Sequence, residues 1–419
     1  MKGVIIKHLL DDLIIRDFMK QYLWQDAIIY QIYLRSFQDS NDDGIGDIGG
    51  VIQRLDYLKS LGVNTLWISP HYQSPMDDNG YDVSDFFQVS VDYGTIEDFK
   101  TLLKEAHQRE MKIITDLVLN HTSDEHPWFE AAKNPDHPLH QKYHDYYIWQ
   151  KPKYNALGKR MMPTEWVSWF GGPVWEYNPP TDEYYLHIFS KKMPDLNWRN
   201  PAMRSDIKAM IQWWVDLGVD GFRVDASNHL EKNWDFPDGK PGYEHFSSLP
   251  KHHEYLQELG KEIFIPNQLL TIGESGGATK EEALQYAGFD GVEFNMLIQF
   301  GHCWADTDPS NTKTPGKWAK GKLDLVNIKE SFSHWIDVFK GKGWNTLYWH
   351  NHDQPRIVSH YGNDQEHHQR SAKMLAYALY LLPGTPIIYY GEEIGMTNVD
   401  YHRRTALSIG EIDSAPHSH

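Results

Sequence analysis

The chain has 419 residues, 40% of them apolar and 14% aromatic, and its 58 acidic against 40 basic residues give a net charge of −18. This length suits a barrel with insertions, and the acidic balance argues against nucleic acid and anionic membranes as partners. No stretch approaches the roughly 20 apolar residues of a membrane-spanning helix. The single cysteine, Cys303, excludes an internal disulfide and favours a cytoplasmic location.

Strand-like and helix-like stretches alternate along the chain after an N-terminal extension, residues 1–23. The spacing of its apolar residues predicts an amphipathic helix. Leu9, Leu10, Leu13 and Ile14 would lie on one face of that helix. The predicted strands are 27–37, 64–70, 112–121, 221–227, 269–275, 291–300, 345–353 and 385–393. The predicted helices include 51–62, 96–110, 203–218 and 373–382. Eight strands in this alternation predict a parallel (β/α)8 TIM barrel of the α/β class.

One segment interrupts this rhythm. Residues 122–200 are rich in His, Pro, Trp, Tyr and Gly, and we expect them to form an insertion domain, domain B, after the third strand. Domain A, the barrel, then comprises residues 24–121 and 201–400. Residues 401–419 are polar, show neither a helical nor a strand period, and predict an irregular tail.

Three predicted strands end in a carboxylate: the fourth in Asp225, the fifth in Glu274 and the seventh in Asp353. In a barrel of this kind the carboxyl ends of the strands build the active site. A retaining glycosidase needs two carboxylates about 5–5.5 Å apart, and neighbouring strands lie about 4.8 Å apart. We therefore predict that Asp225 is the nucleophile and Glu274 the acid/base of a glycoside hydrolase.

Neighbouring residues predict how these acids ionise. Arg223 lies two residues before Asp225, so it faces the same side of the strand and is expected to hold that carboxylate ionised. Glu274 follows an apolar run, a setting expected to raise its pKa toward that of a general acid. Asp353 and His352 are expected to bind sugar hydroxyls and to steady an oxocarbenium-like transition state.

A loop near the N-terminus predicts a cation site. Its potential ligands occupy the first, third, fifth, seventh and ninth positions of an EF-hand loop, with the seventh through its carbonyl: Asp39, Asn41, Asp43, Ile45 and Asp47. Gly44 occupies the sixth position, but Gly50 stands where the bidentate glutamate would be. We expect one structural Ca²⁺ or Mg²⁺ here; the alternative is a solvated turn rich in Asp and Asn.

Four motifs identify the chain as similar to glycoside hydrolase family 13, the α-amylase superfamily, in its oligo-1,6-glucosidase and α-glucosidase branch. They are DLVLNH (116–121), GFRVDA (221–226), GES (273–275) and HNHDQPR (350–356), and the likeness runs from Trp24 to Asn398. MPDLNW (193–198) resembles a further signature of this branch. The resemblance implies Asp225 as nucleophile, Glu274 as acid/base and Asp353 as transition-state stabiliser. It also implies the sugar-binding residues Asp78, Tyr81, His121, Phe170, Arg223 and His352.

The resemblance further implies an exo-acting α-glucosidase of carbohydrate catabolism, monomeric in its intact relatives, that needs no organic cofactor and acts on short oligosaccharides. Ala226, directly after the nucleophile, resembles members that prefer α-1,4 linkages. Trehalose-6-phosphate hydrolase and sucrose isomerase remain alternatives within the superfamily. A non-catalytic binding protein on this fold and an inactive truncated product are alternatives of another class. The family would continue after Val399 with an eighth helix and a C-terminal β-sandwich, so we expect a truncated chain without that domain.

Overall fold

The computed structural model describes residues 23–308, 310 and 321–399. Nearly all of the predicted N-terminal extension and the whole predicted tail, residues 401–419, lie outside these ranges. Within them, no helix has the length and apolar character to cross a membrane.

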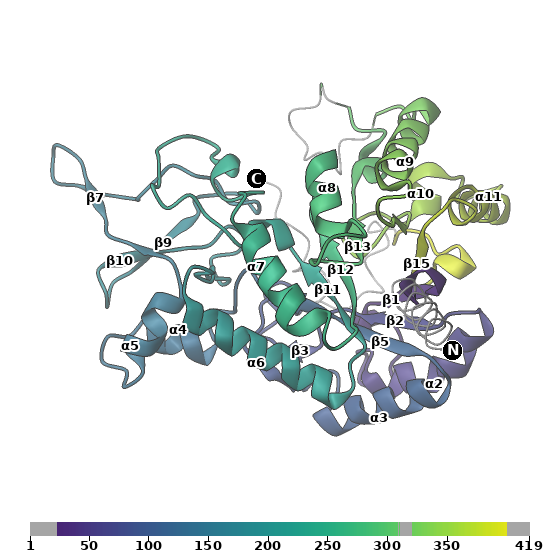
Figure 1. The fold of residues 1–419 in the computed structure, drawn as a ribbon, viewed down its shortest axis with the longest axis horizontal. Helices are drawn as coiled ribbons and strands as arrows, with labels where there is room; N and C mark the ends of the chain where they lie inside the picture. Colours follow the sequence, from purple (N-terminus) through teal and green to yellow (C-terminus); the bar gives the residue numbers. More distant parts are fainter. Residues whose placement is uncertain (1–22, 309, 311–320, 400–419) are drawn as a thin grey trace, which may run out of the picture.

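Eight parallel strands form the central sheet (Figure 1). They are β1 (Ile29–Ile32), β2 (Thr65–Ile68), β5 (Lys112–Val118), β11 (Gly221–Asp225), β12 (Leu270–Glu274), β13 (Met296–Ile298), β14 (Thr346–Leu347) and β15 (Thr385–Tyr389). Their order, β13-β12-β11-β5-β2-β1-β15-β14, confirms the predicted (β/α)8 barrel. The strands are shorter than predicted. For example, β1 ends at Ile32, and a 3-10 turn follows at Leu34–Ser36.

Side chains join the two outermost strands of this order. The hydroxyl of Thr346, in β14, donates to the carbonyl of Leu297, in β13, at 2.8 Å. The hydroxyl of Tyr348 likewise donates to the carbonyl of Gln299 at 2.6 Å. The barrel therefore closes between β13 and β14 through polar side chains.

Helices cover the outside of the barrel, and local signals fix their ends. Asn200 caps the start of α6, Pro201 occupies its first turn, and Gly218, at φ 111°, ends it in a left-handed conformation. The ring comprises α2 (Ile48–Ser60), α3 (Ile96–Gln108), α6 (Pro201–Leu217), α7 (His252–Leu259), α8 (Lys280–Ala287), α9 (Leu325–Phe339), α10 (Ile357–Tyr361) and α11 (His368–Tyr380). A π-helical turn, Gly260–Phe264, follows α7, and 3-10 turns lie at Leu23–Asp26, His144–Tyr146, Ser227–His229, Tyr243–His245, Gly301–Trp304 and Glu392–Ile394.

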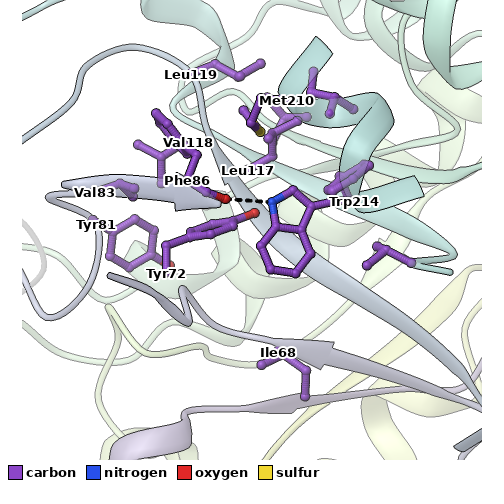
Figure 2. Close-up of a cluster of buried hydrophobic side chains, with 14 of the residues drawn as sticks. Ile68, Tyr72, Tyr81, Val83, Phe86, Leu117, Val118, Leu119, Met210 and Trp214 are labelled. Carbon is purple, nitrogen blue, oxygen red and sulfur yellow. Dashed lines mark hydrogen bonds between the residues drawn. The ribbon is translucent and has the colours of Figure 1, made fainter. Parts of the chain in front are cut away.

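Two apolar layers hold the barrel together. Alternate strand residues such as Ile29 and Ile387 point into the barrel, whereas their neighbours point outward under the helices. Figure 2 shows part of the outer layer, where the indole of Trp214, on α6, donates to the carbonyl of Phe86 at 2.8 Å beside Tyr72. This bond satisfies the one polar atom of a fully buried ring, so the helix docks in a defined position.

The segment between β5 and α6 builds a separate lobe (Figure 1). It contains α4 (Pro127–Ala132), α5 (His140–Tyr143), a three-stranded sheet of β6 (Trp149–Gln150), β10 (Glu183–Leu186) and β9 (Trp175–Asn178), and a hairpin of β7 (Lys153–Tyr154) and β8 (Arg160–Met161). A further hairpin, β3 (Tyr72–Gln73) with β4 (Asp85–Val89), precedes it. The lobe's core around Trp166 also includes Phe246, from the segment after β11. The packing unit thus extends beyond the boundary predicted at residue 200.

Candidate active site

A cavity of about 260 Å³ lies at the carboxyl ends of the barrel strands. It brings together all three predicted catalytic acids, Asp225, Glu274 and Asp353. The predicted sugar-binding residues that line it are Asp78, Tyr81, His121, Phe170 and His352. Ala226, which was predicted to bear on linkage preference, also lines it, whereas the prediction missed Tyr33, Asn79, Phe189 and Met193. A signal existed for Met193, which opens the MPDLNW motif.

Strand register places the predicted nucleophile and acid/base side by side. In the pairing of β11 with β12, Val224 lies opposite Gly273, so the residues that follow them, Asp225 and Glu274, end adjacent strands. The backbone N–H of Ala226 donates to Oε2 of Glu274 at 3.1 Å. Ala226 adopts φ 45°, a left-handed conformation that ends the strand and turns the chain across the cavity.

Arg223 lies behind these carboxylates rather than on the cavity surface. Its side chain is completely buried, with Nη1 2.7 Å from Asp225 Oδ1 and Nη2 2.7 Å from Glu274 Oε2. Nη1 also contacts Oδ1 of Asp116 at 2.5 Å, while the other oxygen of Asp116 accepts the indole N–H of Trp67 at 2.7 Å. A single planar guanidinium therefore fixes the relative position of both predicted catalytic carboxylates. The structure gives Arg223 this positioning contact, and its predicted contact with sugar stays a prediction.

This shared guanidinium bears on the predicted ionisation of Asp225. Burial raises the pKa of Asp225 well above its usual range, Arg223 opposes this, and the nearby charges of Glu274, Asp116 and Asp353 raise it further. Arg223 lowers the pKa of Asp225, as predicted, but this one cation is shared among three carboxylates, and the ionised state of Asp225 stays a prediction. Like charges in a small dry site disfavour full ionisation. Such a site suits a reaction that needs one protonated and one ionised carboxyl group.

His352 is held from several sides. Its Nε2 lies 2.8 Å from the Tyr81 hydroxyl and its Nδ1 lies 3.0 Å from Nε2 of Gln31. The rings of Tyr81 and Tyr33 stack on it, with centroids 5.2 and 6.3 Å away. Its Nε2 is also 3.5 Å from Oδ2 of Asp353. The imidazole therefore has one defined orientation at the cavity wall.

Another part of the site contains a buried ion pair that the sequence did not reveal. Lys232, after β11, lies 2.7 Å from Asp195, and neither side chain is exposed. Lys232 also donates to the amide oxygen of Asn120 at 2.7 Å. This pair joins the MPDLNW motif to the end of β5, where His121 lies. Burial lowers the pKa of His121 to about 3, so this imidazole is neutral and takes part only in hydrogen bonds.

The alpha amylase catalytic domain, as a family profile, matches residues 31–418 of the chain. The chain belongs to the alpha-amylase family. An oligo-1,6-glucosidase of Parageobacillus thermoglucosidasius is 48% identical over 91% of this chain and 67% of its own length. An alpha-glucosidase of Pediococcus pentosaceus is 46% identical over 93% of this chain and 69% of its own length.

Solved structures of the alpha-amylase family share the fold. The trehalose-6-phosphate hydrolase of Bacillus licheniformis superposes with a TM-score of 0.86 at 42% identity, covering 93% of this chain and 68% of that one. Isomaltulose synthase of Erwinia rhapontici NX5 gives a TM-score of 0.83 at 38% identity, covering 90% and 66%. The predicted family and its glycoside hydrolase chemistry are thereby confirmed. The chain spans about two thirds of the length of these relatives.

The predicted cation loop folds around the carboxylate of Asp39. Oxygens of Asp39 accept the backbone N–H groups of Asn41 at 2.9 Å and Gly44 at 2.8 Å, and Gly44 turns the loop at φ 90°. Asp47 instead faces inward, where it caps α2 through Gly50. Within residues 23–308, 310 and 321–399, no three His, Cys, Asp or Glu side chains converge as metal ligands. Asp39, Asn41 and Asp43 carry oxygens of the kind that Ca²⁺ and Mg²⁺ bind, but Asp47 is engaged as a helix cap, and the cation site stays a prediction.

We expect Ca²⁺ or Mg²⁺ to raise the melting temperature, and Asp43→Ala to remove the effect. A cation that binds only the folded state stabilises it by about 2.7 kcal/mol at a hundredfold excess over its dissociation constant. Scanning calorimetry with chelator and with each cation measures the gain. Asp136→Ala, which removes an exposed aspartate outside the loop, is the matched control. Identical curves with chelator and with both cations would rule the site out.

A second titratable site lies beyond β15. Burial raises the pKa of Glu392 to about 7, although the Tyr380 hydroxyl donates to it at 2.6 Å and Arg356 lies nearby. The other facing groups are His350, 3.6 Å away, and Glu393, whose charge raises the pKa. The stability contributed by protonated Glu392 is complete below its ordinary pKa, 4.5, and is lost as the pH rises through about 7.

Glu392→Gln is therefore expected to stabilise the chain relative to the parent above pH 7, by roughly 3 kcal/mol at most, and to have little effect below pH 4.5. The glutamine amide keeps an acceptor for Tyr380 and carries no charge. Urea unfolding between pH 4.5 and 8.5 measures the difference. A stability difference that does not change with pH would contradict the assigned titration.

Proposed function

We propose that the chain is a retaining, exo-acting α-glucosidase that releases terminal α-linked glucose from short oligosaccharides of the maltose and isomaltose type. The supporting observation is the placement of Asp225 and Glu274 on adjacent strand ends, bridged by buried Arg223 within a small cavity. At about 260 Å³ the cavity is smaller than typical pockets for drug-sized ligands, which favours one terminal sugar over a long chain. The oligo-1,6-glucosidase and alpha-glucosidase relatives support the same substrate class.

The proposed mechanism follows from the roles of the three acids. Ionised Asp225 attacks the anomeric carbon, while protonated Glu274 gives its proton to the departing glycosidic oxygen. Water then hydrolyses the glycosyl–Asp225 ester, and Glu274 takes up the proton from that water. Asp353 and the oriented His352 bind sugar hydroxyls and stabilise the developing positive charge. No organic cofactor enters either step.

We assign the linkage preference to Ala226, which lines the cavity and directly follows Asp225. We propose a preference for α-1,4 linkages. Ala226→Val is expected to shift the ratio of kcat/KM values toward isomaltose by about tenfold, since added methyl groups in a pocket change discrimination by about 1–3 kcal/mol. Kinetics with maltose and isomaltose measure the ratio, and NMR of the first product formed reports its anomer. Initial release of β-glucose from an α-glucoside would contradict the retaining mechanism.

Trehalose-6-phosphate hydrolysis receives less support, although a relative with that activity shares the fold. A phosphorylated sugar requires a cation near its phosphate. Among the described residues that line the cavity, none is a lysine or an arginine. Faster turnover of trehalose 6-phosphate than of maltose would reverse this ranking. A cytoplasmic location, a monomeric state and independence from nucleic acid and membranes are part of the proposal.

A further inference from the structure

Each strand that carries one of the paired carboxylates is followed closely by a serine. Ser227 comes two residues after Asp225, and Ser275 comes directly after Glu274. Both serines are completely buried, and their hydroxyl oxygens lie 2.8 Å apart. Since β11 and β12 are adjacent strands (Figure 1), this hydrogen bond joins the two loops that leave the strand ends bearing the carboxylates.

The turn after Asp225 also holds Glu274 at two points. The hydroxyl of Ser227 donates to the backbone carbonyl of Glu274 at 2.8 Å. The backbone N–H of the preceding residue, Ala226, donates to the Glu274 carboxylate at 3.1 Å. One turn therefore restrains both the backbone and the side chain of Glu274.

The backbone of this turn depends on such contacts. Ala226 has a φ of 45°, in the left-handed region that residues other than glycine rarely adopt. A residue keeps such a conformation only where the surrounding structure imposes it. The contacts of Ala226 and Ser227 with Glu274 supply that restraint, so loss of the Ser227 hydroxyl would loosen the turn and the Glu274 carboxyl group together.

The helices that follow the two strands hold the serine pair from behind. The side chain of Ser275 hydrogen-bonds to that of Tyr286, in α8. Tyr286 also hydrogen-bonds to Nε2 of His252, in α7, and Nδ1 of His252 lies 2.6 Å from the carbonyl of Leu249. Tyr286 and His252 are completely buried as well. The serine pair is therefore anchored to both helices and not only to the strand ends.

We propose that Ser227 and Ser275 are positioning residues that set the place of the Glu274 carboxyl group relative to Asp225. This inference rests on the proposed function, in which Glu274 gives its proton to the departing oxygen. Two buried hydroxyls that served packing alone could be replaced by apolar groups at little cost. Here they join the two strand ends whose carboxylates must lie about 5–5.5 Å apart in a retaining mechanism.

Kinetics of the full chain with two aryl α-glucosides test the positioning role. A dinitrophenyl group departs without a proton, whereas a phenyl group needs one, and kcat/KM reports this first step. We expect Ser227→Ala and Ser275→Ala each to lower kcat/KM for the phenyl glucoside by about 10- to 100-fold, since misplacing a reacting group by about 1 Å costs up to about a hundredfold. The dinitrophenyl glucoside is expected to be little affected. The ratio of the two values does not depend on the fraction of folded protein, so a partly unfolded variant still reports the effect.

The double variant Ser227→Ala with Ser275→Ala tests whether the two hydroxyls act as one unit. It is expected to lose no more than either single variant, because removing one hydroxyl already breaks the bond between them. Losses that multiply would contradict a shared role.

Thr346→Val is the matched control. The Thr346 hydroxyl also donates to a backbone carbonyl of the neighbouring strand at 2.8 Å, but it joins β14 to β13. We expect the parent ratio of the two kcat/KM values in this variant. An unchanged ratio in both serine variants, or an equal shift in Thr346→Val, would overturn the inference.

Glu274→Gln separates this inference from the function on which it rests. It is expected to shift the ratio in the same direction as the serine variants, and further. If Glu274→Gln leaves the ratio unchanged, the proposed function fails and the positioning role fails with it. If Glu274→Gln shifts the ratio and neither serine variant does, the positioning role alone fails.

Discussion

Asp225→Asn is expected to reduce hydrolysis of an aryl α-glucoside by a factor on the order of 10⁴–10⁶, the loss seen when one member of a catalytic unit is removed. An amide cannot form the covalent glycosyl intermediate, and no other group in the cavity replaces it. The side chain is close to isosteric and keeps an oxygen for Arg223, so the fold is expected to persist. Steady-state kinetics and circular dichroism measure the two effects.

Glu274→Gln gives the matched comparison for the acid/base. Its loss is expected to depend on the leaving group, being large for oligosaccharides and smaller for an activated aryl glucoside, which departs without a proton. Azide is expected to restore part of the second step by replacing general-base activation of water. Comparable turnover by Asp225→Asn and the parent, or an equal loss on both substrates for Glu274→Gln, would contradict the assigned roles.

Arg223→Met is expected to destabilise the chain by about 3–5 kcal/mol at pH 8, because it leaves three carboxylates without their buried cation. Without the guanidinium, burial and mutual repulsion raise the pKa values of Asp225 and Asp116 further above their unfolded values. Groups whose pKa is raised on folding contribute stability at low pH and lose it as the pH rises. The deficit is therefore expected to be larger at pH 8 than at pH 5.

Arg109→Met is the control variant for Arg223→Met in the stability measurement. Arg109 also contacts two acids, Asp56 at 2.6 Å and Glu105 at 2.8 Å, but Asp56 is largely exposed. Solvent and salt screen exposed ion pairs, so a small effect that is nearly independent of pH is expected. Urea unfolding of the parent and both variants at pH 5 and pH 8 measures the energies. Similar losses for Arg223→Met and Arg109→Met would show that the buried bridge is not the source of the stability.

Activity separates the positioning role of Arg223 from its effect on stability. Arg223→Lys keeps a positive charge but provides one ammonium group instead of a planar fork. It is expected to fold better than Arg223→Met and yet to show a lower kcat and a shifted pH profile, since one ammonium cannot hold both carboxylates at the bridged spacing. A parent-like kcat and pH profile in folded Arg223→Lys would contradict the positioning role.

The sequence by itself determined the barrel and the location of its site. Alternation of apolar stretches at strand and helix periods is a local property, so it predicted β1 and α6 without tertiary information. The acids Asp225 and Glu274 were found for the same reason: each ends an apolar run, and parallel strands bring their carboxyl ends to one side of a barrel. Asp353 follows three polar residues and lies beyond β14, which ends at Leu347, so the structure places it in the loop after the strand.

Tertiary structure alone decided how these groups act together. The bridge from Arg223 to Asp116 and Glu274, and the pair of Lys232 with Asp195, join residues that are far apart in the chain. The spacing of residues along the sequence does not predict such contacts. The same holds for the pKa of Asp225, because desolvation depends on everything packed around a carboxyl group and not on its neighbours in sequence.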